Sequence, residues 1–435
     1  MRFFAIFIIG VLCSFFLFPI SFTFLPGINT KMFLAVFGAA WFLFERLPEG
    51  GLSFSKELLG ALGLSTVFSL VCFFAADYNG TVDYSYATYI FSAIVWLFSA
   101  YAIIAFIRQI HGTVNLRLLT LYLAGVCLFQ CVIALVMDRV EVVKSIVNAY
   151  VNIDQNFFTK VDRLYGIGAA LDPAGVRFSI VLILIAIVLS KNVRVQQNKG
   201  TIAYLILSFL IIIGLGNMIS RTTTIGAVLG VLILALSAGL EHFIIKRSML
   251  KTYGILLGFL CALVPIGIYL YQTDDFFHEQ IRFAFEGFFN WVEGGTWETG
   301  STNKLNAVMW VWPEDFKTWI IGTGRFGLYE FSTDIGYCRF ILYCGLIGFS
   351  IFSIFMIYHP IVLYKRFYNY RFAFLCLAVL TFVIWVKVAT DIFFIYALFY
   401  WIEKEDEEAD ILSEEDEEEE IHEEYENNLL YSGDI

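Results

Sequence analysis

The sequence predicts an all-α polytopic membrane protein. Its composition fits a chain whose solvent is a bilayer, because 59% of the 435 residues are hydrophobic, 18% are aromatic and the mean hydropathy is +0.75. Long apolar runs recur along most of the chain, and a helix needs about 20 apolar residues to cross the roughly 30 Å hydrocarbon core. Only 7 prolines are present, and little of the chain remains for a separate soluble domain.

About twelve transmembrane helices are predicted within residues 1–402, which we treat as one membrane domain. Each predicted span is an apolar run bounded by charged or turn residues. The first run follows a single Arg2 and is longer than the apolar core of a signal peptide, so we interpret it as a first span and not as a cleaved leader. The predicted spans are 3–25, 31–45, 57–76, 87–107, 118–137, 176–190, 201–219, 222–240, 253–271, 337–358, 372–386 and 389–402.

The last segment, residues 403–435, differs in composition from the rest. It holds 17 of the 39 acidic residues and one of the 28 basic ones, so the other 27 basic and 22 acidic residues leave the membrane domain with a net charge of +5. So acidic a run cannot bury enough apolar surface to fold. We therefore predict a disordered acidic tail.

Basic residues recur in alternate short loops, which predicts an orientation. By the positive-inside rule these loops and the N-terminus are cytoplasmic, and an even number of spans puts the acidic tail on the same side. The outer face then carries two long connections, 138–175 and 272–336. The basic loops contain Arg46/Lys56, Arg108/Arg117, Lys191/Arg194/Lys199, Lys246/Arg247/Lys251 and Lys365/Arg366/Arg371.

The second outer connection carries large apolar residues at roughly helical spacing. This pattern predicts an amphipathic helix that lies on the outer interface or covers a cavity. A partly buried loop helix with aromatic anchors explains the pattern equally well. The residues are Phe276, Phe277, Ile281, Phe285, Phe288 and Trp291.

No pattern typical of a metal or disulfide site is present. The eight cysteines lie within or at the edge of apolar runs without a Cys-x-x-Cys pair, and the five histidines are scattered. Asp274, Asp275, His278 and Glu279 are close in sequence, but they begin a loop and are interpreted as solvated charges. We expect no metal and no cofactor.

Three arginines on the predicted outer face are candidates for binding an anion. Arg221 separates two apolar runs in a hairpin too short for a true loop, so its guanidinium must lie at the membrane edge or face a wet cavity. Arg163 and Arg177 flank a turn marked by Pro173 and Gly175, which puts Arg177 near the outer end of the next span. The alternative for each is a snorkelling or solvated charge.

Lys387 and Asp391 lie four residues apart in the otherwise apolar stretch 372–402. As one helix this stretch would be roughly 46 Å long, more than the approximately 30 Å core requires, so two short spans that turn near Lys387 are predicted. The two side chains either pair on one helix or lie at the outer turn.

The stretch 322–348 contains the most specific pattern. It begins with a Gly-x-Gly-x-x-Gly turn that includes Arg325, and it continues with Asp334 at the start of a span and Arg339 five residues later. Two glycines further along this span allow a neighbouring helix to approach closely. Taken alone, Asp334 is interpreted as a helix N-cap.

These residues resemble the O-antigen polymerase (Wzy-type) and O-antigen ligase superfamily of bacterial membrane glycosyltransferases. The resemblance covers about twelve spans, the Ser-Arg-Thr hairpin at 220–222, a large outer loop before the tenth span and the glycine turn at 322–327. Ligases of this superfamily carry a His, ten residues and then a Gly, and here the same spacing joins Asp334 to Gly345. The change from His to Asp favours a polymerase-like member.

The resemblance implies an enzyme of the bacterial cytoplasmic membrane with a periplasmic active face and cytoplasmic termini. It would move a growing polysaccharide from undecaprenyl diphosphate to a lipid-linked repeat unit, without a metal. Asp334 would accept the proton of the attacking sugar hydroxyl. Its partners would be the lipid-linked oligosaccharide, membrane lipid and a chain-length regulator, with no nucleic acid. The diphosphate would be held by Arg163, Arg177, Arg221, Arg325, Arg339 and Lys387.

Other functions are compatible with the same residues. A ligase would transfer the finished glycan to another acceptor, such as lipid A core or a protein. A lipid-linked oligosaccharide flippase or other transporter would use the arginines to line a passage, and a membrane scaffold would recruit partners through the acidic tail. The ionisable residues lie mostly at span ends and in loops, which favours an enzyme over a transporter.

Overall fold

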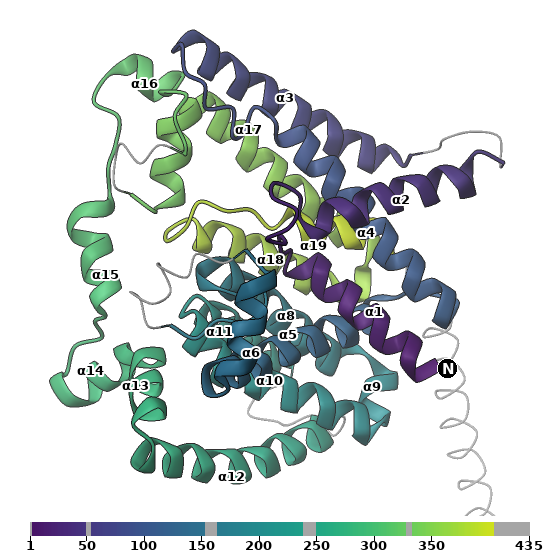
Figure 1. Ribbon diagram of the computed structural model, residues 1–435, viewed down its shortest axis with the longest axis vertical. Coiled ribbons are helices and arrows are strands. Elements are labelled where there is room, and N and C mark those ends of the chain that lie inside the picture. Colours follow the sequence, from purple (N-terminus) through teal and green to yellow (C-terminus); the bar gives the residue numbers. More distant parts are fainter. Residues whose placement is uncertain (1, 49–53, 153–162, 238–248, 328–332, 404–435) are drawn as a thin grey trace, which may run out of the picture.

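The computed structural model describes residues 2–48, 54–152, 163–237, 249–327 and 333–403, and within these ranges the chain is helical apart from connections and two isolated β-bridges (Figure 1). In these described ranges seven helices are long and apolar enough to cross a bilayer, which confirms the prediction of a helical chain with several membrane-spanning helices. They are α3 (Lys56–Tyr78), α4 (Tyr89–His111), α5 (Leu116–Arg139), α8 (Leu171–Lys191), α10 (Lys199–Ile219), α12 (Leu250–Thr273) and α17 (Gly336–Arg366).

Several shorter helices complete the helical body. Of the predicted features, the tail from residue 404 on and the loop with Lys246 and Arg247 lie outside the described residues. The shorter helices of the body are α1 (Arg2–Leu17), α2 (Thr30–Arg46), α11 (Thr223–Ser237), the 3₁₀ turn η4 (Tyr368–Tyr370), α18 (Arg371–Ile384) and α19 (Phe393–Phe399).

The first helix is shorter than the predicted span 3–25, because it ends at Leu17. The hydroxyl of Thr30, the first residue of α2, donates to the Phe15 carbonyl at 2.9 Å and accepts from the Ile20 amide at 3.1 Å. These bonds satisfy backbone groups left free where α1 ends, and they hold the chain as it turns back toward α2.

The last apolar stretch forms two short helices, as predicted, but the second is shorter than the predicted span 389–402. Helix α19 has seven residues, about 10 Å at 1.5 Å per residue, which is too short to cross the core by itself. The side chain of Asp391 accepts the Phe393 amide at 2.9 Å, so the helix restarts only after this acid. Residues 385–392 form a non-helical connection.

Helix α8 occupies the centre of one half of the body. Every residue from Phe178 to Leu189 is buried, and α5, α10, α11 and α18 pack around it. This burial accounts for a helix that is apolar on all sides. In the other half, α17 packs on α3, and α4 packs on α2 and α19.

The basic loops and the outer connections lie on opposite sides of the body. In Figure 1 the N-terminus and the short helix α9 (Val193–Gln197) are on the right, and the helices of the second outer connection are on the left. The end of the described chain lies with the basic loops, because Glu403 pairs with Arg108 at 3.3 Å and the Ile402 carbonyl accepts from Arg366 at 2.7 Å. This separation agrees with the positive-inside pattern.

Both outer connections contain helices of their own. The first contains α6 (Glu141–Tyr150), which has no buried residue. The second contains α13, α14, α15, the π-helical turn η3 and α16. Their bounds are Asp275–Ala284 for α13, Glu286–Gly294 for α14, Gly300–Lys304 for α15, Leu305–Met309 for η3 and Phe316–Ile320 for α16.

The predicted amphipathic helix of the second outer connection is confirmed, although it is broken into α13 and α14 at Phe285. The apolar residues of α13 pack against the core, whereas Phe288 and Trp291 of α14 are exposed. Arg139 at the end of α5 donates to Asp274, the N-cap of α13, at 2.7 Å. This contact fixes the start of α13 on the body.

Helix α17 is interrupted at Gly345, which has φ of 63° and ψ of −176°. The interruption changes the partners of the carbonyls just before it. The Leu342 carbonyl accepts from the Thr323 amide at 2.7 Å, and the Tyr343 carbonyl accepts from the Gly324 amide at 2.9 Å. Non-helical backbone at membrane depth is tolerated where such groups find partners, and here the glycine turn provides them.

The turn and the break in α17 approach each other so closely that both need glycine. A Cβ atom on Gly345 would lie 2.1 Å from the Ile320 carbonyl oxygen, and a Cβ atom on Gly322 would lie 2.2 Å from that of Tyr343. The close approach predicted for the glycines of this span is confirmed at Gly345. The glycine at the end of the Asp334 to Gly345 spacing is therefore needed for the backbone conformation at this position.

Gly345→Ala is expected to destabilise the protein. Alanine would have to adopt a backbone conformation that is essentially restricted to glycine, at a cost of roughly 1–3 kcal/mol, and its Cβ would overlap the Ile320 carbonyl. Thermal unfolding of the purified protein in detergent measures the effect. Gly63→Ala is the control, because Gly63 lies in α3 and its Cβ would meet nothing within 4 Å. Equal Tm values for the two variants would contradict the interpretation.

Candidate functional site

The predicted site residues come from segments that meet near the connection 385–392. Lys387 of this connection contacts both the start of α8 and the hairpin 220–222. The Trp385 carbonyl accepts from the Tyr337 amide at 3.3 Å, which brings the start of α17 to the same place. The structure therefore gathers residues that are far apart in the sequence at the outer-connection side of the body.

The centre of this region is a group that we call the Asp172 cluster, formed by Asp172, Ser220, Thr222 and Lys387. One oxygen of Asp172 accepts from Lys387 Nζ at 2.8 Å, from Thr222 Oγ1 at 2.6 Å and from Ser220 Oγ at 3.1 Å. The Asp172 and Lys387 side chains are 26% and 31% exposed, so the ion pair keeps access to solvent. Lys387 lies in the turn between α18 and α19 and not on one helix with Asp391, and its partner is Asp172.

Arg221 lies beside this cluster and is held by the second outer connection. Its guanidinium forms an ion pair with Glu286 of α14 and donates to Ser301 Oγ of α15 at 3.1 Å. It is 15% exposed and lies 4.5 Å from the centre of the Phe283 ring. Arg221 thus joins the tight hairpin to the connection that covers it and does not extend freely toward water.

The guanidinium of Arg163 lies 5.0 Å from the centre of the same Phe283 ring and is therefore close to Arg221. Burial lowers the pKa of Arg163, the charge of Arg221 lowers it further, and Asp172 opposes the shift. The arginines and Lys387 are three cations against the carboxylates of Asp172 and Glu286. An anion bound here would relieve the repulsion between the two guanidiniums.

Arg177 belongs to a second charged group, with Lys31 of α2 and Asp391 of the connection 385–392 as its charged neighbours. Its guanidinium donates to the Pro173 carbonyl at 2.7 Å and lies 5.1 Å from the centre of the Phe394 ring. Among the described residues, its Nε atom is buried without a hydrogen-bond partner. This group also carries more positive than negative charge.

Asp334 lies at the start of α17, between the buried residues Thr333 and Ile335. The N-cap position of α17 is Ile335, and no side-chain hydrogen bond is found at this cap within the described chain. Ile335, and not Asp334, therefore occupies the N-cap position. Two residues further on, Gly336 packs directly against the connection 385–392.

The two remaining predicted cations, Arg339 and Arg325, lie at the glycine turn 322–327. Arg339 donates to the Phe326 carbonyl at 2.7 Å and stacks 4.1 Å from the centre of its ring. It therefore fixes the glycine turn 322–327. Arg325 lies in that turn and is exposed.

The sequence interpretation missed Asp83, which holds the same turn from the connection between α3 and α4. Its carboxylate accepts from the backbone amides of Phe326 at 2.5 Å and Gly327 at 2.6 Å. Partial burial raises the pKa of Asp83, but these bonds and those from Ser85 outweigh it, so the pKa is below its ordinary value. An acid just after a predicted span gives no signal of this contact.

Two of the residues considered for a metal site have other partners. Asp274 pairs with Arg139, and the ring of His278 stacks on Tyr271. In the part of the chain that the structure describes, no group of three His, Cys, Asp or Glu side chains could hold a metal ion.

The fold and these charged groups define a polytopic helical membrane protein with a positively charged region at one side of its helical body. No known protein family, curated protein or solved structure matches the chain. Its function has to be inferred from the charged groups themselves.

Asp83→Asn is expected to lower stability near neutral pH and to have little effect in acid. Because the folded-state pKa is depressed, the stabilisation is fully present above the ordinary Asp pKa of about 3.9 and is lost as pH falls through the folded value. Thermal unfolding from about pH 6 to about pH 3 measures the profile. Asp77→Asn is the control, since Asp77 is exposed at the end of α3. If Asp83→Asn follows the wild-type profile, the carboxylate does not hold the turn.

Proposed function

We propose that the chain is a polysaccharide polymerase of the O-antigen or capsule type. It transfers a growing glycan from undecaprenyl diphosphate to a lipid-linked repeat unit, without a metal. The observation that supports this most is the gathering of Arg163, Arg177, Arg221 and Lys387 beside the connection 385–392. A departing diphosphate carries negative charge, which guanidinium and ammonium groups stabilise.

The proposal includes a location in the membrane. The protein has about twelve spans in the bacterial cytoplasmic membrane, with its basic loops and both termini in the cytoplasm and its charged region on the periplasmic face. The separation of basic loops from outer connections in Figure 1 supports this orientation. On that face the charged region meets lipid-linked precursors after they have crossed the membrane.

The proposed reaction is one inverting displacement. The acceptor hydroxyl attacks the anomeric carbon of the donor, the bond to the lipid diphosphate breaks, and Asp334 takes the hydroxyl proton. The cations hold the leaving diphosphate. Asp83 and Arg339 fix the glycine turn against the break in α17, and in this way they position the start of that helix.

The ion pair of Arg221 with Glu286 suggests how the outer connection takes part. When donor diphosphate binds, it replaces Glu286 as the partner of Arg221, and α14 is released from the hairpin. Arg221 can serve both partners because carboxylate and phosphate oxygens accept the same pair of N–H donors. The connection would then open as the donor enters.

A ligase and a flippase are the other candidate functions, and one gene deletion separates them from a polymerase. Loss of a polymerase leaves surface glycan as single repeat units. Loss of a ligase leaves unattached polymer, and loss of a flippase traps the precursor inside the cell.

Lys31, Arg177 and Asp391 lie at or near helix ends, which favours an enzyme over a charged passage through the membrane.

Arg221→Lys is expected to lose activity at normal protein level, because a point charge cannot replace the two-pronged guanidinium. The loss should be roughly 10- to 100-fold, the contribution of one charge-assisted hydrogen bond. Initial rates of polymerisation of a purified lipid-linked repeat unit measure it. Full activity of the variant would mean that Arg221 does not recognise phosphate.

Glu286→Gln is the matched variant, since it removes the same ion pair but keeps the guanidinium. If Arg221 binds diphosphate, this variant keeps kcat and does not raise KM. If Arg221 serves only to anchor α14, both variants lose activity equally.

Asp334→Asn is expected to reduce the polymerisation rate by about 10²- to 10⁴-fold, because Asn keeps the size of Asp but cannot accept a proton. Protein level and Tm should be unchanged, and a chelator in the assay excludes a contaminating metal. Asp334→His is expected to keep partial activity, since imidazole is also a base near neutral pH. A wild-type rate for Asp334→Asn would move the search for the base to Asp391 and to Glu330, which lies outside the described residues.

A further inference from the structure

An apolar groove with a volume of about 740 Å³ lies between α1 and α5. Helix α10 and the end of α4 contribute to its wall, and none of the predicted site residues lines it. Its volume is within the range of about 300–1,000 Å³ that is typical of small-ligand sites. Phe7 and Phe129 on its rim are exposed, so the groove opens sideways toward lipid.

The length of the groove matches one leaflet of the bilayer. Its wall on α5 runs from Leu118 to Gln130, which is about 18 Å at 1.5 Å per residue. Half of the hydrocarbon core is about 15 Å. An extended hydrocarbon chain that enters from one membrane surface would fill the groove.

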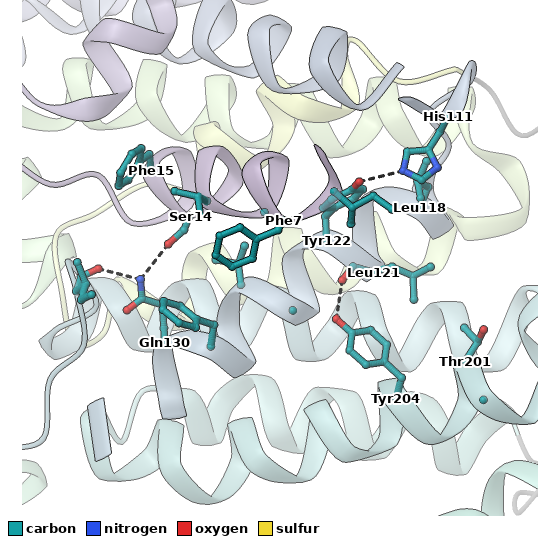
Figure 2. Close-up of a pocket in the computed structure, with 18 residues that line it drawn as sticks. Phe7, Ser14, Phe15, His111, Leu118, Leu121, Tyr122, Gln130, Thr201 and Tyr204 are labelled. Carbon is teal, nitrogen blue, oxygen red and sulfur yellow. Dashed lines mark hydrogen bonds between the residues drawn. The ribbon is translucent and has the colours of Figure 1, made fainter. Parts of the chain in front are cut away.

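Polar groups mark the two ends of the groove, as Figure 2 shows. One end of the groove faces the first outer connection. There Gln130 donates to Ser14 Oγ at 3.0 Å and to the Ile167 carbonyl at 2.9 Å, and these bonds close the groove. At the other end His111 and Tyr122 are hydrogen-bonded at 2.9 Å. We call this second end the mouth of the groove.

The mouth lies on the side of the basic loops. It adjoins the loop in which the Val114 carbonyl accepts from Glu403 at 2.9 Å. Arg2 and Arg117 lie close enough to His111 to act on it electrostatically, and Lys199 directly precedes the lining residue Gly200. Arg117 forms no ion pair with any described residue, and its Nε atom is buried without a hydrogen-bond partner there. Within the described ranges, the mouth therefore carries net positive charge.

We propose that the groove binds one acyl chain of an anionic phospholipid, whose phosphate lies at the mouth near Arg2, Arg117 and His111. The charge at the mouth favours an anionic over a zwitterionic head group, since each basic residue near a membrane surface contributes about 1 kcal/mol to binding an anionic lipid. The occupant is not the polyprenyl donor, because the mouth and the charged region lie on opposite sides of the body. This inference is independent of the proposed function.

The test is mass spectrometry of the intact protein released from detergent, after incubation with palmitoyl-oleoyl phosphatidylglycerol or the matching phosphatidylcholine. Phosphatidylglycerol is expected to be retained as one molecule per protein, in preference to phosphatidylcholine. Gly10→Leu should abolish retention, because Gly10 lines the groove and its Cβ would meet nothing within 4 Å, so the new side chain fills the space. Gly63→Leu is the matched control, since Gly63 has the same open surroundings on α3.

The charge of the mouth is tested in the same assay with a second pair of variants. Arg117→Gln should reduce the preference for phosphatidylglycerol about five-fold, the equivalent of about 1 kcal/mol. Lys56→Gln removes an exposed charge at the start of α3 and should leave the preference unchanged.

If Gly10→Leu does not fold, Val11→Trp fills the same groove.

Three results would overturn the proposal. Equal retention of the two phospholipids would remove the role of the charge. Retention that survives both groove-filling variants would place the lipid elsewhere. Displacement of phosphatidylglycerol by undecaprenyl phosphate would assign the groove to the donor lipid. None of these measurements depends on enzymatic activity, so their outcome is separate from that of the polymerase assay.

Discussion

A backbone carbonyl in hydrocarbon must find a donor, and the break in α17 shows how much of this structure depends on that constraint. The φ of 63° at Gly345 interrupts the helix, and amides of the glycine turn take up the carbonyls of Leu342 and Tyr343. Asp83 and Arg339 hold this glycine turn in place. Because Asp334 lies at the start of the same helix, its position depends on this chain of contacts.

Electrostatics explains why the charged side chains collect where helices end. A charge far from water is costly, so the cations of the charged region lie in connections or near helix ends, and carboxylates from other segments pair with Lys387 and Arg221. Asp172 pairs with Lys387 and Glu286 pairs with Arg221, which still leaves positive charge in excess. Partial exposure of both pairs keeps the desolvation cost moderate and lets an anionic ligand compete for the cations.

Hydropathy predicts most of the helices because an apolar run is a local property, but it fails where a single side chain sets the backbone. Helix α1 ends where the Thr30 hydroxyl donates to the Phe15 carbonyl, and α19 starts late because Asp391 accepts the Phe393 amide. Ion pairs are harder still, because no pattern joins Lys387 to a residue 215 positions away. The sequence therefore singled out candidate cations, and only the fold shows their partners.

The charged region and the apolar groove differ in the kind of ligand that they suit. At the outer connections several cations from separate segments converge with hydroxyl groups and carboxylates, an arrangement suited to a polar ligand that enters and leaves. Between α1 and α5 a continuous apolar wall ends in a few basic residues, which suits a hydrocarbon chain that remains bound. Because α5 and α10 line the groove and also pack against the central helix α8, a lipid in the groove would support the helix that carries Asp172 and Arg177.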